Sequence, residues 1–236
     1  MEQIKLSKRL RAIANYVAVG AKVADIGTDH GYIPVWLAQN KIAQSLAAAD
    51  INIGPLEHAK ETAHKYGVSE QIRFALCSGL EFEGSSAYDT IIIAGMGGEL
   101  IASILEAAPW TSQKDTTLIL QPNSFIPYLT RWLVEHGFQI TDASLVKDAG
   151  KLYQILVVKP GQGAVITSET QGLVNSLYFE KRDPLLAEYL DSLLKRYTAA
   201  EKGMLSAKEQ GSALAETKSM IAALTEMKKE AESWQQ

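Results

Sequence analysis

Val23-Ala24-Asp25-Ile26-Gly27-Thr28-Asp29-His30-Gly31-Tyr32-Ile33-Pro34 is the stretch that decides the fold. It reads as a buried strand that ends in a glycine-bearing turn, and the turn opens a helix. The next apolar run ends in an acidic residue, Asp50. A strand, a glycine turn and a helix, followed by an acid at the next strand end, predict a nucleotide-like ligand at the carboxyl edge of a parallel sheet.

Short apolar runs alternate with helical patterns from Lys22 to Pro160. Strands separated by single helices need right-handed crossovers, so we expect a parallel sheet with helices on both faces. The expected strands are 22–25, 45–50, 72–77, 90–94 and 117–121. The expected helices are 32–39, 55–66, 98–107 and 126–136.

The pattern changes after His136-Gly137. Apolar runs at 138–146 and 152–159 are joined by Lys147-Asp148-Ala149-Gly150, which leaves no room for a helix and therefore predicts an antiparallel hairpin. A parallel sheet that ends in a hairpin is typical of the α/β class I methyltransferase Rossmann-like fold. A dinucleotide dehydrogenase would more usually continue with strand–helix units, so a nicotinamide oxidoreductase is the least favoured class.

A linker is expected at Pro160-Gly161-Gln162-Gly163, which separates a Rossmann-like domain (1–160) from a helical coiled-coil hairpin (164–236). Asp183-Pro184 has the pattern of an N-cap followed by proline at the first helical position. Gly203 or Gly211 is the expected reversal between the two helices. The apolar stripes that predict the hairpin are Leu186, Leu190, Leu193 and Tyr197, followed by Leu214, Ile221 and Leu224.

Charge and cysteine content limit the partners. The net charge of −4 argues against coating by a polyanion over the whole surface, but a local basic face can still bind nucleic acid. The single cysteine, Cys77, excludes an internal disulfide, gives no metal cluster and indicates a reducing cytoplasm. No apolar run approaches the roughly 20 residues that a membrane span needs. We therefore expect a cytoplasmic protein with neither a membrane segment nor a metal.

The first turn has the D-x-G-x-x-x-G spacing of S-adenosylmethionine enzymes, from Asp25 to Gly31. Gly27 lets the backbone turn sharply and approach a ligand. Asp29 would repel a pyrophosphate but suits a cationic sulfonium and an ammonium. The alternative is a tight strand–helix turn with a capping aspartate. His30 is equally a proton carrier or a cap. Asp50 would accept hydrogen bonds from both ribose hydroxyls, or would simply solubilise a strand end.

Further turns at the same predicted edge supply the other candidates. Three glycines in Ala94-Gly95-Met96-Gly97-Gly98 expose backbone amides beside the expected methyl group, or serve close strand–helix packing. This loop lacks the N-P-P-Y sequence of amino-directed adenine methyltransferases. Cys77-Ser78-Gly79-Leu80 suits a loop beside an adenine ring, or an ordinary turn. Asn123, in Gln121-Pro122-Asn123, lines a base pocket or caps a helix. Tyr32 stacks on a base or packs on the first helix.

The N-terminal segment is amphipathic. Leu6, Leu10, Ile13 and Val17 are spaced for one face of a helix, and Lys5, Lys8, Arg9 and Arg11 fall on the opposite half. Either this half is a solvated face, or it contacts phosphates at the rim of the active site.

At these residues the chain resembles the bacterial tRNA adenine-22 N1-methyltransferase family (TrmK). The resemblance is carried by residues 25–34 and by Ile93-Ala94-Gly95-Met96-Gly97-Gly98, with support from Leu6-Ser7-Lys8-Arg9-Leu10 and Gln121-Pro122-Asn123. The hairpin turn, Asp148-Ala149-Gly150-Lys151-Leu152-Tyr153-Gln154, departs from the family's acidic-Gly-Lys-Tyr-Tyr-Glu.

The resemblance implies methyl transfer from S-adenosyl-L-methionine to N1 of an adenine in the tRNA D-arm, with Asp29 as the catalytic residue. The base would have to be extruded from its helix. The cofactor candidates are Asp25, Gly27, Thr28, His30, Asp50, Ile51, Ser78, Gly79 and Gly95. The substrate candidates are Lys8, Arg9, Arg11, Tyr32, Met96, Gly97 and Asn123.

Two other classes stay open at this stage. One is a small-molecule or protein methyltransferase, and the other is a non-catalytic nucleotide-binding module with an interaction coiled coil. A monomer is expected, with a dimer through the helical tail as the alternative.

Overall fold

The protein is described by a computed structural model that covers residues 2–113, 115–207 and 211–234. The chain forms two compact units, Met1–Val165 and Ile166–Gln236. The division falls just after the Pro160–Gly163 segment, where glycines replace the apolar runs of the preceding strands.

A seven-stranded sheet forms the first unit, in the order β3-β2-β1-β4-β5-β7-β6. The first five strands pair in parallel, and β7 runs antiparallel to both β5 and β6. A parallel sheet that ends in an antiparallel hairpin confirms the class I methyltransferase Rossmann-like fold predicted from the sequence. The strands are β1 (Lys22–Ile26), β2 (Ser45–Asp50), β3 (Ile72–Leu76), β4 (Thr90–Gly97), β5 (Thr117–Ser124), β6 (Phe138–Asp148) and β7 (Lys151–Pro160).

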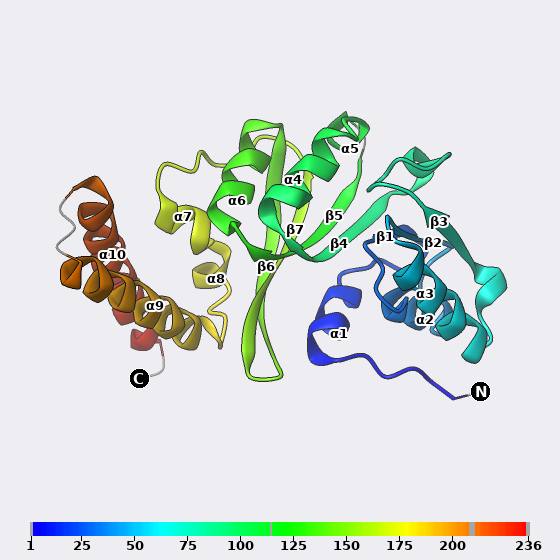
Figure 1. The fold of residues 1–236 in the computed structure, drawn as a ribbon, viewed down its shortest axis with the longest axis horizontal. Coiled ribbons are helices and arrows are strands. Elements are labelled where there is room, and N and C mark those ends of the chain that lie inside the picture. Colours follow the sequence, from blue (N-terminus) through cyan, green and yellow to red (C-terminus); the bar gives the residue numbers. More distant parts are fainter. Residues whose placement is uncertain (1, 114, 208–210, 235–236) are drawn as a thin grey trace. The chain divides into compact units, whose positions relative to one another are not determined.

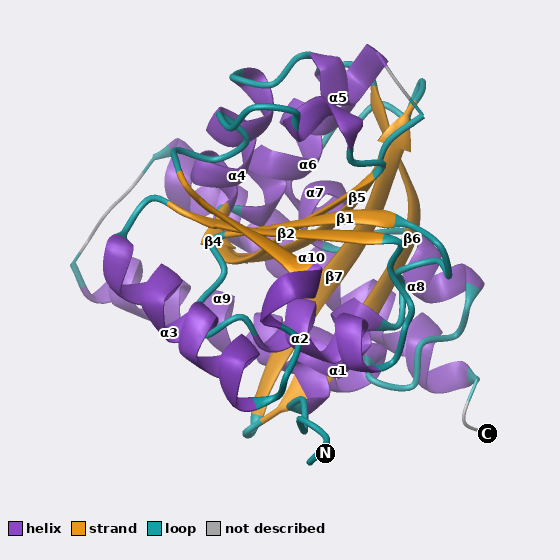
Figure 2. Ribbon diagram, turned by 90° about the vertical axis from the view of Figure 1, so that its right-hand side faces the viewer, coloured by secondary structure: helices purple, strands orange, loops and turns teal. Residues whose placement is uncertain are grey.

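Helices cover both faces of the sheet, as Figure 2 shows. Helices α1, α2 and α3 lie on one face, and α4, α5 and α6 lie on the other. Two short 3-10 turns lie at Ser69–Gln71 and Ser85–Ala87. The helices of this unit are α1 (Lys8–Ala14), α2 (Tyr32–Gln39), α3 (Ile53–Lys65), α4 (Gly98–Glu106), α5 (Trp110–Gln113) and α6 (Ile126–Glu135).

The central strand β4 continues further than the sequence predicts. Ile91, Ile92 and Ile93 are fully buried, as expected of a strand covered on both faces. Beyond Ala94, the strand pairs irregularly with β5, through Met96 to Pro122, and then through Gly97 to Ser124. The glycine segment is therefore not a free loop, because the neighbouring strand holds it at the edge of the sheet.

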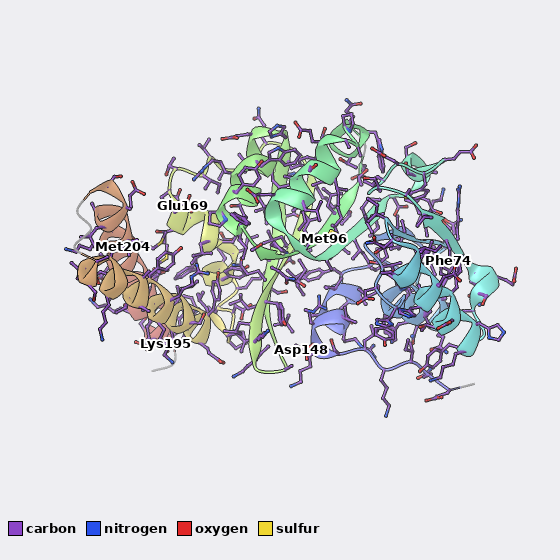
Figure 3. The ribbon with its side chains drawn as sticks, in the orientation of Figure 1. Phe74, Met96, Asp148, Glu169, Lys195 and Met204 are labelled. Carbon is purple, nitrogen blue, oxygen red and sulfur yellow. The ribbon has the colours of Figure 1, made fainter. Side chains whose placement is uncertain are left out.

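The β6–β7 hairpin provides a docking surface for α1 (Figure 1). Helix α1 is shorter than the predicted amphipathic stretch: it begins after Leu6 and ends before Val17, so these two residues lie outside the helix. Its residues Ile13 and Ala14 are buried in the core. Asp148, labelled in Figure 3, lies at the hairpin turn, and its carboxylate accepts a hydrogen bond of 3.2 Å from the backbone N–H of Arg9.

The second unit is helical. Its two long helices are antiparallel, because Asp191, near the start of α9, pairs with Lys228, near the end of α10, at 2.6 Å. Helix α9 begins at Leu186, so the prediction that Asp183 is the N-cap is wrong; the Asp183 carboxylate instead accepts from Leu185 N. Gly203 lies within α9, whereas Gly211 caps α10. The helices are α7 (Glu169–Leu173), α8 (Leu177–Glu180), α9 (Leu186–Ser206) and α10 (Ser212–Ser233).

Most residues of the two predicted apolar stripes are at least partly buried in the helical unit. Leu186, Leu190, Leu193 and Leu224 are buried, while Tyr197, Leu214 and Ile221 are half-buried. Among the described residues, no helix combines the length and the apolar character that crossing a membrane requires.

Candidate active site

The turn after β1 is fixed by its neighbours. The backbone N–H groups of Gly27 and Thr28 both donate to the carbonyl of Ala49 at the end of β2, at 2.8 and 3.0 Å. The backbone is left-handed at His30 and Gly31, with φ of 61° and 63°. A Cβ on Gly31 would lie 2.9 Å from the Cβ of Ala59, so the turn packs directly on α3. The two ends of this turn are therefore in direct contact with β2 and α3.

A hollow of about 160 Å³ opens beside this turn. Asp25, Gly27 and Asp29 line it, as the sequence predicts for one site at the end of β1. His30 and Tyr32 line it as well. Helix α1 contributes Arg9 and Leu10, and β4 contributes Ala94.

Asp25 is buried, with 7% of its surface exposed. Burial raises the pKa of its carboxyl to about 6; the nearby Thr28 hydroxyl lowers that pKa, and the charge of Asp50 raises it. The Thr28 hydroxyl is itself buried and, among the described atoms, has no partner at hydrogen-bond geometry. A buried acid and a buried hydroxyl without a partner are a pair of polar groups suited to a polar ligand.

Asp29 differs sharply from Asp25, because 73% of its side chain is exposed. The ring of His30 lies beside it, with Nε2 3.4 Å from Oδ1. The His30 ring stacks on Tyr32 on one side, with centroids 5.3 Å apart, and on His58 of α3, with centroids 5.1 Å apart. The left-handed His30 thus carries a ring contact with α3 rather than a helix cap.

The ends of β2 and β3 carry a second group of candidates. Asp50 is half-buried, and its Oδ1 accepts from the backbone N–H of Asn52 at 2.7 Å. The other candidates in these turns are Ile51, Ser78 and Gly79. Exposed apolar side chains accompany them: Ile51 is 66% exposed, Ile53 57% and Leu76 56%. An acid among exposed apolar side chains suits a ligand with a flat ring and a polyhydroxyl part.

The glycine segment at the end of β4 is held by an amide network. Asn123 donates from Nδ2 to the carbonyl of Gly95 at 2.8 Å and accepts from Nε2 of Gln121 at 2.9 Å. The prediction that Asn123 caps a helix is wrong, because the N-cap of α6 is Phe125. Met96, labelled in Figure 3, reaches back over Gly27, and Gly97 lies against the Ser124 hydroxyl. Met96 and Gly97 therefore lie beside the hollow without lining it.

The basic residues of the N-terminal segment do not form one solvated face. Nη1 of Arg9 donates to Oε1 of Gln121 at 2.6 Å, and its guanidinium lies over the Tyr153 ring at 5.4 Å. Arg11 stacks on Trp36 at 4.2 Å. Lys8 is exposed at the start of α1. Arg9 lines the hollow and is therefore not part of a solvated face, whereas the contact of these residues with phosphates stays a prediction.

Sequence reasoning missed four residues that shape the site: His58, Gln121 as an anchor, Asp148 and Tyr153. All four act through contacts over long sequence separations, which periodicity does not report. The Ser7 hydroxyl and the Arg9 backbone N–H hold the pKa of Asp148 below its usual value. No set of three or more His, Cys, Asp or Glu side chains in residues 2–113, 115–207 and 211–234 is arranged to hold a metal.

Comparison with known proteins identifies the family. A family model for a methyltransferase domain matches residues 6–156. The Bacillus subtilis (strain 168) tRNA (adenine(22)-N(1))-methyltransferase is 39% identical over 161 residues, which are 68% of this chain and 68% of that protein.

Two solved structures have the same fold. The Streptococcus pneumoniae protein Sp1610 in complex with S-adenosyl-L-methionine has a TM-score of 0.84 and 32% identity, covering 95% of this chain and 100% of that chain. The Bacillus subtilis m1A22 tRNA methyltransferase TrmK has a TM-score of 0.76 and 29% identity, covering 98% of this chain and 99% of that chain. With these matches added to the sheet order and the β1 turn, the chain belongs to the TrmK family of tRNA (adenine(22)-N(1))-methyltransferases.

Proposed function

We propose that this protein transfers a methyl group from S-adenosyl-L-methionine to N1 of adenine 22 in the D-arm of tRNA. The observation that carries the proposal is that the exposed carboxylate of Asp29 lines the same hollow as Asp25 and Gly27. Family membership supports the reaction type and the substrate class.

The residues at the end of β1 fit this cofactor. Gly27 has φ of 72°, a left-handed conformation that glycine adopts without strain, and the Met96 methyl group occupies the space that a Cβ would take. Asp25 and the Thr28 hydroxyl are buried polar groups that a ligand ammonium or water can satisfy. We assign Asp50 to the ribose hydroxyls, and Ile51, Ser78 and Gly79 to the adenine side. His30 and Gly95 complete the proposed cofactor set.

When bound, S-adenosyl-L-methionine supplies a methyl group on a positively charged sulfur. We assign Asp29 to the other partner, the adenine, where it accepts a hydrogen bond from the exocyclic N6 amine and orients the ring. N1 carries an in-plane lone pair, so no residue has to remove a proton before attack. Positive charge develops across N1, C6 and N6 of the adenine during the transfer, and the Asp29 carboxylate stabilises it. Because Asp29 is exposed without substrate, the RNA itself has to exclude water from this carboxylate.

The substrate has to present an unpaired base, because N1 lies on the Watson–Crick edge. We assign Tyr32, Met96, Gly97 and Asn123 to the surroundings of that base. Arg9 faces the hollow, and Lys8 and Arg11 lie nearer the surface, so we assign Arg9 to the target nucleotide and the other two to the RNA backbone. With tRNA as the substrate, we place the reaction in the cytoplasm, and we propose a monomer.

Nucleoside mass spectrometry tests the proposal. Unmodified tRNA with adenine at position 22 is incubated with the protein and methyl-labelled cofactor, digested, and analysed for labelled N1-methyladenosine. The expected result is one labelled N1-methyladenosine per tRNA, absent when adenine 22 is replaced by guanine. Label in N6-methyladenosine, or in peptides or metabolites instead of tRNA, contradicts the proposal.

A further inference from the structure

The N-terminal segment encloses a second hollow beside the candidate active site, and nothing described so far uses it. Its volume is about 460 Å³, larger than the hollow at Asp29. We propose that this second hollow binds a nucleotide that flanks the methylated adenine in the same RNA strand. The inference rests on the proposed function and adds a site for a second nucleotide of the substrate.

The walls of this hollow are built from distant parts of the chain. Ile4 and Lys5 come from the N-terminal segment, Leu10 from α1, Tyr32 from the start of α2 and Tyr66 from the end of α3. Gln39 of α2 holds the segment in place: its Oε1 accepts from Ile4 N at 2.9 Å, and its Nε2 donates to the carbonyl of Glu2 at 2.9 Å. Ile4 is 5% exposed and packs in the core. The segment is therefore a fixed wall.

Tyr32 connects the two hollows, because it lines both of them. Tyr32 is 39% exposed, and its ring stacks on the nearly parallel ring of His30, which in turn stacks on His58. Leu10 also lines both hollows. Adjacent nucleotides in an extruded strand are joined by one phosphate, so two hollows that share a wall suit two consecutive nucleotides.

The lining has the chemistry of a nucleotide site. Two aromatic rings and the Leu10 side chain provide surfaces on which a base can stack. Lys5 provides a positive charge for the connecting phosphate. Gln3 offers an amide to a base edge, and no hydrogen bond or ion pair of the Gln3 or Lys5 side chain occurs among the described residues. Glu2 adds one carboxylate that can accept from a base amine.

Neither variant chosen for the test touches Asp25, Asp29 or the β1 turn. Lys5→Gln removes the positive charge, and Gln3→Trp fills the hollow from an exposed position. Lys22→Gln is the matched control, because Lys22 is an exposed lysine at the amino end of β1, the opposite edge of the sheet. The measurements are the KM for tRNA, its dependence on salt, kcat, and cofactor affinity by calorimetry.

Lys5→Gln is expected to raise the KM for tRNA several-fold and to reduce the slope of log affinity against log salt by roughly 1. Gln3→Trp is expected to raise the KM roughly tenfold if it replaces one stacked base. Both variants should keep the wild-type cofactor affinity, and Lys22→Gln should keep every parameter.

Cross-linking locates the nucleotide directly. Wild-type protein is irradiated with tRNA that carries 4-thiouridine on either side of adenine 22, and the attached peptide is identified by mass spectrometry. Attachment within residues 2–7, at Tyr32 or at Tyr66 is the expected result. Wild-type methylation together with unchanged KM in both variants and attachment elsewhere refutes this site and leaves the proposed function intact. A wild-type protein that methylates no tRNA refutes both.

Discussion

Nη1 of Arg9 lies 2.6 Å from Oε1 of Gln121, although the two residues are 112 positions apart in the chain. Gln121 is fully buried, and its other amide atom donates to the Pro122 carbonyl at 3.1 Å and to Asn123 at 2.9 Å. Through Asn123 this network reaches the carbonyl of Gly95. The guanidinium in the hollow and the glycine segment at the end of β4 are thus held by one buried amide.

The Arg9–Gln121 pair should show coupling in a double-mutant cycle. Gln121→Met keeps the volume but leaves Arg9 and Asn123 without their partner, which should cost about 1–3 kcal/mol of the free energy of unfolding. Arg9→Met alone and the double variant complete the cycle, measured by urea unfolding. We expect a coupling energy above about 0.5 kcal/mol. Additive effects would show that the contact contributes nothing to stability.

Asp29→Asn should lower kcat by about 100-fold or more, because the carboxylate that stabilises the developing charge is lost. Cofactor affinity should stay near the wild-type value, measured by calorimetry, because the substitution only replaces an exposed carboxylate by an amide of the same size. Glu57→Gln is a suitable control, since Glu57 is an exposed acid on α3 that pairs with Lys60. An Asp29→Asn protein with near wild-type turnover would contradict the assigned role.

Asp25 should make the protein less stable as the pH rises. The pKa of Asp25 is about 6 in the folded protein, against 3.8 in an unfolded chain, so folding favours the protonated form. The stability that protonated Asp25 gives the folded state is fully present below about pH 4 and is lost as the pH rises through about 6. The magnitude of this change in the free energy of unfolding is on the order of 3 kcal/mol.

The comparison of wild type with Asp25→Asn isolates this contribution, because the other carboxylates cancel. We expect the free energy of unfolding of Asp25→Asn, relative to wild type, to increase between pH 4 and pH 7 by that amount. Urea unfolding at several pH values provides the measurement. A difference that is constant with pH would place the titration elsewhere.

Two glycines at helix starts should respond oppositely to alanine. A Cβ on Gly98 would lie 2.5 Å from the carbonyl oxygen of Phe125 and 3.0 Å from the Cβ of Leu129, so Gly98→Ala forces α4 and α6 apart. We expect a loss of about 1–3 kcal/mol. Gly54, in the first turn of α3, has nothing within 4 Å of its Cβ position, so Gly54→Ala should stabilise the protein by about 0.5–1 kcal/mol. Thermal and urea unfolding measure both, and equal effects would contradict the packing argument.

Local signals predicted the elements that local chemistry determines. Helix 32–39 and strand 45–50 have the predicted bounds, because a glycine turn opens the helix and a short buried apolar run forms the strand. The prediction for β4 was too short. Its last residues include glycines, which do not favour strands, and they are held in the sheet by pairing with β5, a distant segment of the chain. Asp183 shows a related error: its carboxylate accepts a hydrogen bond from Leu185 N, and Leu185, one residue before the helix begins, is the N-cap.

The site was predictable where one turn contains it. Asp25, Gly27 and Asp29 share a hollow because they lie at the end of a single strand and in the turn that follows it. The orientation of Arg9 was not predictable, since helical periodicity places it among solvated charges, whereas Gln121 and Tyr153 draw it inward. The ring stack on His58 was missed for the same reason, because α3 contributes it from a distant part of the chain.

The hydrogen bond from Arg9 N to Asp148 also bears on how the protein is made. These residues are 139 positions apart, and Tyr153 lies further still along the chain. During synthesis on the ribosome, α1 is made long before the β6–β7 hairpin on which it docks. Arg9 therefore cannot form its native contacts until these last two strands have been made. A nascent chain shorter than about 150 residues can form the early strand–helix units, but it has no closed reaction centre. Because of this order of synthesis, the active site can be completed only after the whole sheet has left the ribosome.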